Sequence, residues 1–171
     1  MRRNLHSCTP DIKHIAYNTL VRPTLEYCAA VWDPYTQNNI TKLEQINTNA
    51  ARFITNDYSL APGTTTRIKQ QINMVPLNKR RQTHRLTLMY KISHNYIDIN
   101  KHEYPQEANT RSTRNSHTQK YQTYHTNTDT YKHSFFPKTI KEWNNLPQNI
   151  IGSPSINTFH NKVYDDIIKT Q

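Results

Sequence analysis

The stretch from Leu20 to Thr36, LVRPTLEYCAAVWDPYT, decides how the N-terminal helices of this chain are arranged. Most of its residues are apolar or aromatic, as in a buried helix, but two prolines interrupt it. Pro23 has no backbone N–H and clashes with the preceding turn, so it predicts a kink or break just before it. Arg22 and Glu26 are four positions apart and would lie side by side across this kink. The stretch therefore predicts two short helices that pack closely.

Helical periodicity continues on both sides of this stretch. Thr9 and Pro10 are typical residues of a helix start, and Thr36 is a candidate N-cap for a longer helix. Pro62 and Gly63 are helix-breaking residues, so a loop is expected after this longer helix. We expect a helical bundle over residues 1–97. Its helices are predicted at about 10–21, 24–32, 36–54, 67–74 and 77–96.

Residues from about 98 to 131 have a different composition. They contain few aliphatic side chains, and a segment that buries so little apolar area cannot offset its conformational entropy. It is predicted to be a polar, partly disordered linker, in which residues 120–124 and 130–136 could pair as a short β-hairpin. Residues 132–171 regain helical spacing and end in an amphipathic helix that should pack back on the bundle. The predicted fold is mainly α: an irregular helical bundle with a polar loop-rich segment and a C-terminal amphipathic helix.

Composition narrows the class of protein. The formal net charge is +10, which indicates a polyanionic partner such as nucleic acid. No apolar run reaches the roughly 18 residues that a transmembrane helix needs, and no signal peptide is expected. Cys8 and Cys28 cannot form a disulfide framework, which favours an intracellular setting, nucleus or cytoplasm alike.

The positive charge is concentrated in one segment. Between Asp57 and Asp98 there is no Asp or Glu, but there are seven Lys and Arg residues. The run from Lys79 to Arg85 predicts a basic helix ridge that contacts phosphates; the alternative is an ordinary solvated face. Basic residues near Tyr121 and Tyr124 form a second candidate, with a disordered spacer as the alternative. The predicted nucleic-acid-binding residues are Arg67, Lys69, Lys79, Arg80, Arg81, Arg85, Arg111, Arg114 and Lys120.

Four residues are predicted to be structural. Arg22 and Glu26 are expected to form a partly buried ion pair, because an arginine held by a carboxylate is poorly placed to bind phosphate. Trp32 lies in the most apolar segment, so it is expected in the core rather than stacked on bases. Trp143 is expected on the buried face of a later helix.

Catalytic and metal-binding patterns are absent from the sequence. There is no Gly-rich phosphate loop, G-x-S-x-G or H-E-x-x-H. His6, Cys8 and His14 lack the spacing of a structural zinc site. Asp165 and Asp166 are the only adjacent acids, and they are expected on a helix surface rather than around catalytic metals. We expect no enzymatic activity, cofactor, metal or small-molecule substrate.

Four blocks of the sequence resemble, in the same order, the region after the polymerase core of LINE-type (non-LTR, jockey-like) retrotransposon reverse transcriptases. The blocks are LVRPTLEYCAAVWDPYT (20–36), LEQINTNAARFITNDY (43–58), VPLNKRRQTHRLTLMYKI (75–92) and HSFFPKTIKEWNNLPQNI (133–150). The resemblance implies the thumb and post-thumb region of an RNA-directed DNA polymerase, without its catalytic and endonuclease parts. It places Arg22, Lys42 and Arg52 in thumb-like helices. It also implies RNA or an RNA–DNA duplex as partner, with a reverse transcriptase core in trans as another.

The sequence thus favours a non-catalytic fragment that binds RNA or RNA–DNA hybrid through a basic helix. Two alternatives stay open: a protein-interaction module, or a decayed fragment of a transposable element with no selected function. An exposed apolar patch around Tyr17, Leu20 and Trp32 would favour the protein-interaction module. A continuous basic groove would favour nucleic acid.

Overall fold

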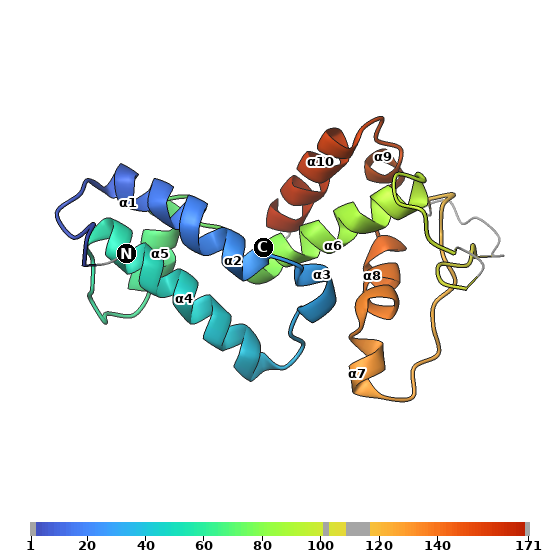
Figure 1. Ribbon diagram of the computed structural model, residues 1–171, viewed down its shortest axis with the longest axis horizontal. Helices are drawn as coiled ribbons and strands as arrows, with labels where there is room; N and C mark the ends of the chain where they lie inside the picture. Colours follow the sequence, from blue (N-terminus) through green and yellow to red (C-terminus); the bar gives the residue numbers. More distant parts are fainter. Residues whose placement is uncertain (1–2, 101–102, 109–116, 170–171) are drawn as a thin grey trace. The chain divides into compact units, whose positions relative to one another are not determined.

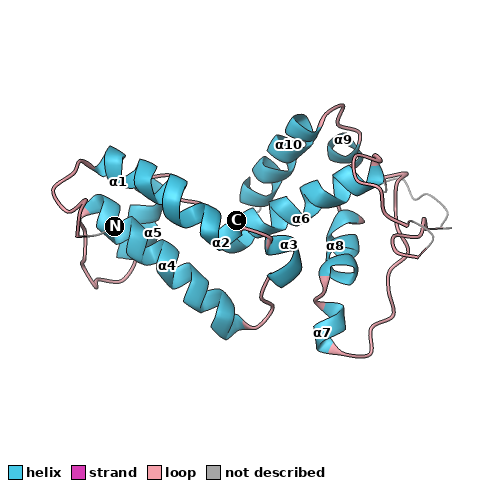
Figure 2. Ribbon diagram, viewed as in Figure 1, coloured by secondary structure: helices cyan, strands magenta, loops and turns pink. Residues whose placement is uncertain are grey.

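The computed structural model describes residues 3–100, 103–108 and 117–169. They are mainly helical, which confirms the predicted fold class of an irregular helical bundle (Figure 2). Arg111 and Arg114, both predicted to bind nucleic acid, lie outside the described residues. The chain divides into two compact units: unit 1 is Met1–Ala29 with Pro34–Arg80, and unit 2 is Ala30–Asp33 with Arg81–Gln171. The sequence predicts the first boundary at residue 97, whereas this division falls between Arg80 and Arg81.

Unit 1 is a small helical bundle. Helices α1 and α4 run side by side, and α5 packs on α4 (Figure 1). Its core is made by Tyr17, Ala51, Ile54, Ile68 and Met74. The bounds of its helices are α1 Pro10–Ala16, η1 Tyr17–Val21, α2 Arg22–Glu26, α4 Gln37–Thr55 and α5 Thr64–Gln71.

Of the predicted kink or break at Pro23, the break is wrong, because helical structure continues through the proline. Residues Tyr17–Val21 form a π-helical turn, in which the N–H of Arg22 donates to the carbonyl of Tyr17. Pro23 has no N–H to donate and its ring crowds the preceding turn, so a wider turn at this point relieves the crowding. The helix ends at Glu26, because Tyr27 leaves the helical conformation with ψ 129°; Cys28 follows with a left-handed φ of 50°.

The predicted helix at 36–54 is confirmed as α4, with Thr36 as its N-cap residue. The next helix, α5, begins at Thr64 rather than at Arg67. Gly63 precedes it with φ 81°, a conformation that glycine adopts without steric cost.

Unit 2 is organised around the part of α6 that follows Arg80. Helices α8, α9 and α10 pack against this part of α6 (Figure 1). Tyr90 of α6 stacks on Phe159 of α10, with ring centres 4.3 Å apart, and Trp143 of α8 is fully buried beside them. The bounds are α3 Ala29–Trp32, α6 Leu77–Ser93, α7 Asp129–Lys132, α8 Phe135–Trp143, α9 Gln148–Ile151 and α10 Ile156–Lys169; α3 and α6 each begin in unit 1.

The polar segment after α6, predicted to be a partly disordered linker, is packed against α8 where it is described. The carbonyl of Tyr121 accepts a hydrogen bond from Asn144 at 2.7 Å, and the indole N–H of Trp143 donates to the carbonyl of Gln119 at 2.8 Å. Residues 109–116 of this segment lie outside the described residues. Backbone carbonyls, which composition does not reveal, therefore anchor it to α8.

The expected hairpin is not formed. Tyr121 makes an isolated antiparallel bridge to Glu107 instead. Most of residues 130–136, the second predicted strand, are helical in α7 and α8. The Thr128 side chain caps α7 by accepting from the N–H of Tyr131, which favours a helix start at that position.

Candidate functional site

The first arginine of the predicted basic ridge is engaged within unit 1. Arg80 donates from Nε and Nη2 to the two carboxylate oxygens of Glu26. Arg22 lies on the same carboxylate, with its Nε 4.0 Å from Oε2, and its Nη1 donates to Asn18 at 2.8 Å. The predicted Arg22–Glu26 pair is confirmed, but Glu26 has Arg80 as its closer partner.

The next two arginines are buried in unit 2. The side chains of Arg81 and Arg85 are only 1% and 3% exposed. Asp33 accepts hydrogen bonds from both, at 2.7 Å from Nε of Arg81, and from Lys138 at 2.6 Å. Arg85 also donates to both oxygens of Glu142, at 2.8 and 2.9 Å. The prediction that these arginines face outward is wrong: α6 turns them into the interior.

The electrostatics of this cluster hold Asp33 in its charged form. Burial acts to raise the pKa of Asp33, but the charge of Arg85 and the hydrogen bonds from Lys138 and Arg81 outweigh it, so the pKa lies below its ordinary value. For Glu142 burial outweighs the attraction of Arg85, and the pKa is raised. Arg81 and Arg85 of α6 therefore compensate the buried charge of Asp33.

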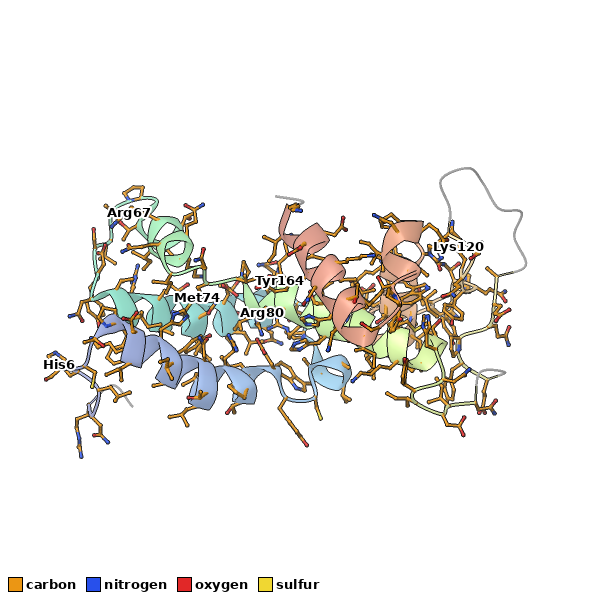
Figure 3. The ribbon with its side chains drawn as sticks, turned by 90° about the horizontal axis from the view of Figure 1, so that it is seen from above. His6, Arg67, Met74, Arg80, Lys120 and Tyr164 are labelled. Atoms are coloured by element: carbon orange, nitrogen blue, oxygen red, sulfur yellow. The ribbon has the colours of Figure 1, made fainter. Side chains whose placement is uncertain are left out.

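Two further predicted contacts are also ion-paired in unit 1. Arg67 of α5 has a 63% exposed side chain and pairs with Asp57 (Figure 3). Lys69 donates to Glu44 at 2.7 Å, and the same carboxylate accepts the N–H of Leu77 at 3.0 Å. Lys69 thus helps to hold the start of α6. The remaining predicted cations, Lys79 in unit 1 and Lys120 in unit 2, are half-buried.

The two tryptophans differ in burial. Trp143 is fully buried, which confirms its predicted structural role. Trp32 is 39% exposed, so its predicted place in the core is wrong. Its ring lies 6.0 Å from the guanidinium carbon of Arg81, within the range of a cation–π contact.

The first helices of unit 1 expose three large apolar side chains on their outer side. Ile12, Ile15 and Leu20 are 48%, 63% and 66% exposed. Ile12 and Ile15 share one face of α1. The extra residue of the π turn brings Leu20 towards the line that they begin, whereas an unbroken α-helix would turn it away. We call these three residues the apolar ridge.

A pocket of about 420 Å³ opens between η1 and α4. Ile46 and Tyr58, 41% and 46% exposed, belong to its wall. The Nε atom of Arg52 is buried and finds no hydrogen-bond partner in the described part of the chain. Nearly all the other contributing side chains are apolar or aromatic. The lining residues are Tyr17, Val21, Ile46, Asn49, Ala50, Arg52, Phe53 and Tyr58.

Sequence reasoning missed this pocket. Ile46, Ala50 and Phe53 lie at helical spacing and form an apolar stripe in the sequence, but such a stripe indicates only a buried face. The one available signal was Arg52, a cation inside that stripe, which the resemblance alone placed in a thumb-like helix.

The described residues contain no group of three or more His, Cys, Asp and Glu side chains that could hold a metal ion. None of their helices is long and apolar enough to cross a membrane. The chain matches no protein-family model, curated protein or solved structure.

Proposed function

We propose that the chain is a non-catalytic helical module that binds another protein through unit 1. The observation that carries this proposal is the apolar ridge. An amphipathic surface helix ordinarily presents polar residues to water, and exposed apolar side chains gathered on one face are typical of interaction sites. Burying them against a partner is favourable by about 25 cal/mol for each Å² of apolar surface.

The ion pairs of α6 weigh against the basic ridge as the main interface. Arg80 and Arg81 each have a carboxylate partner, and Arg85 has two. A phosphate would have to displace those carboxylates and expose or strand buried charges, which is costly. Protein binding needs no such rearrangement, because the apolar ridge is already exposed.

The proposal is tested by selecting binders from a phage-displayed library of random peptides on the immobilised full chain. Ile15→Asp and Leu20→Asp place a charge on the apolar ridge. Val31→Asp is the matched control, because Val31 is 87% exposed and lies in α3, outside unit 1. Enriched peptides should bind the wild type and the control alike, and the two ridge variants at least about tenfold more weakly.

Equal binding to all four proteins would reject the apolar ridge as the interface, and failure to enrich any peptide would count against protein binding itself. The resemblance to LINE-type reverse transcriptases suggests a polymerase core in trans as the first natural partner to try. Circular dichroism spectra of the variants must match the wild type, since the comparison requires folded protein.

RNA or an RNA–DNA duplex is the second candidate. The observation that favours it is charge: unit 1 contains ten Lys and Arg residues against four Asp and Glu. A fluorescent RNA–DNA hybrid titrated with the chain at two salt concentrations is the test. Binding through phosphates should weaken steeply with salt, by a log–log slope of about 0.9 for each neutralised phosphate on a duplex. Weak binding without salt dependence would remove this candidate.

A further inference from the structure

We propose that the pocket between η1 and α4 receives an acidic peptide segment of the protein partner, with an apolar side chain in the pocket and a neighbouring carboxylate on Arg52. The inference rests on the proposed protein-binding function of unit 1. It goes further by naming the chemistry of the partner and the residues that recognise it.

The walls of the pocket fit an apolar side chain. Ile46, Ala50 and Phe53 contribute from α4, and Val21 from η1. Its volume of about 420 Å³ leaves room for a large side chain such as Phe or Leu together with part of the backbone that carries it. Helices that dock on such a groove insert one or two apolar anchors from a single face.

Arg52 supplies a directional contact at the edge of this apolar wall. Among the described residues its buried Nε finds no acceptor, an arrangement that proteins rarely leave unfilled. A carboxylate is the acceptor that fits a guanidinium best, because two parallel hydrogen bonds can form. The nearby carboxylate of Asp57 is already engaged by Arg67 and by the N–H of Ser59 at 3.0 Å.

The charge of unit 1 favours the same partner. Ten basic residues against four acidic ones attract a segment that carries several carboxylates. A nucleic-acid strand would also be attracted, but it needs a row of cations along its phosphates. The lining of this pocket includes one cation, Arg52, among mostly apolar side chains, which favours the peptide.

The probe is a short fluorescein-labelled helical peptide with Phe and Leu on one face and Glu and Asp on the other. Two twin peptides test its chemistry: one has every acid replaced by Lys, and the other has Phe replaced by Ser. Fluorescence polarisation is measured with the full chain and three variants. Arg52→Gln removes the cation, Asn49→Trp fills the pocket, and Asn39→Trp makes the same substitution at another exposed position of α4.

We expect the acidic peptide to bind the wild type and Asn39→Trp equally. Arg52→Gln should weaken binding about tenfold, and Asn49→Trp should abolish it. The Lys twin and the Ser twin should each bind at least about tenfold more weakly to the wild type. In the wild type, amide resonances of Asn49 and Ala50 should shift on addition of the acidic peptide, a measurement that needs no variant to fold.

The proposal is overturned if Arg52→Gln and Asn49→Trp bind as well as the wild type, or if those amide resonances do not move. It is also overturned if a single-stranded RNA oligonucleotide binds in the same Arg52-dependent way, since the pocket would then recognise phosphate. Peptide binding that survives both pocket variants but is lost in Ile15→Asp would leave the apolar ridge as interface and remove only the pocket. If no acidic or selected peptide binds at all, the protein-binding function fails too.

Discussion

Asp33 and Arg81 are 48 positions apart in the chain and are joined by a hydrogen bond of 2.7 Å between Oδ1 and Nε. Their side chains are 8% and 1% exposed, so this ion pair is shielded from water. Arg85 and Lys138 converge on the same carboxylate. This one carboxylate therefore pairs with three cations in unit 2, and its loss would leave their charges less compensated.

Replacing Asp33 with Asn should destabilise the chain by about 3–5 kcal/mol, because removing one partner of a buried ion pair leaves uncompensated charge. Urea unfolding measures the loss. Asp165→Asn, an exposed acid on α10, is the control and should change stability little. The pKa of Asp33 is lowered on folding, so its contribution is present above its ordinary pKa of about 3.9 and is lost as pH falls below that value. The difference between wild type and variant should shrink accordingly in acid.

Arg81→Gln should lower stability by about 3 kcal/mol and leave the RNA affinity of the folded protein unchanged. Arg81 holds Asp33 and has a nearly fully buried side chain, so it has no surface to offer a phosphate. Lys42→Gln removes an exposed cation of α4. If RNA binds unit 1, this variant should keep its stability and lose RNA affinity. A stable Arg81 variant with weakened RNA affinity would restore the basic ridge as the binding surface.

Tyr17→Phe should cost about 1–3 kcal/mol, because the phenol donates a buried hydrogen bond of 2.8 Å to Asn47 whose acceptor is then left unpaired. Tyr104→Phe, which removes an exposed hydroxyl, is the matched control. Burial, helped by the charges of Glu26 and Glu44, raises the pKa of Tyr17 to about 12. The unfolded chain releases this proton first, so the wild type should lose stability relative to the variant as pH rises through about 10.

Acid should weaken the anchoring of the polar segment on α8 through His117. Its Nε2 bonds the carbonyl of Trp143 at 3.0 Å, and its buried Nδ1 has no partner in the described chain. Burial lowers the pKa of this imidazole. The unfolded state therefore binds the proton more readily, and stability should fall as pH drops below about 6.5.

The pH dependence of stability in His117→Gln should be flatter than in the wild type across that range. His125→Gln, at an exposed position of the same segment, should keep the wild-type slope. Identical slopes in all three proteins would show that His117 does not couple to folding.

Local periodicity predicted the long helices well. The apolar stripes of α4 and α10 depend only on side chains three and four positions apart, and both helices lie where the spacing places them. Of the kink or break expected at Pro23, the break is wrong, because the sequence shows that a proline interrupts the α pattern but not that a π turn can accommodate it.

The ion pairs of α6 were less predictable than the helices, because the partner residues are far apart in the sequence. The acid-free run around α6 was interpreted as a free cationic face, but its compensating acids come from positions 48, 52 and 57 residues away. Such pairs cannot be found by comparing residues three or four positions apart on one helix. Likewise, an apolar stripe shows which residues leave water, but not that Ile46 and Ala50 line an open pocket while Ala51 lies in the core.

The π turn at Tyr17–Val21 bears on how the length of this chain can vary. Its hydrogen bonds span one residue more than those of an α turn, so the segment holds one residue that a regular helix would not need. A relative without Pro23 could delete that residue and still present the faces of α1 and α2 in the same directions. Alignments of such chains should therefore place a single-residue gap between positions 17 and 21, and a shortened variant with Pro23→Ala is the one most apt to keep the bundle intact.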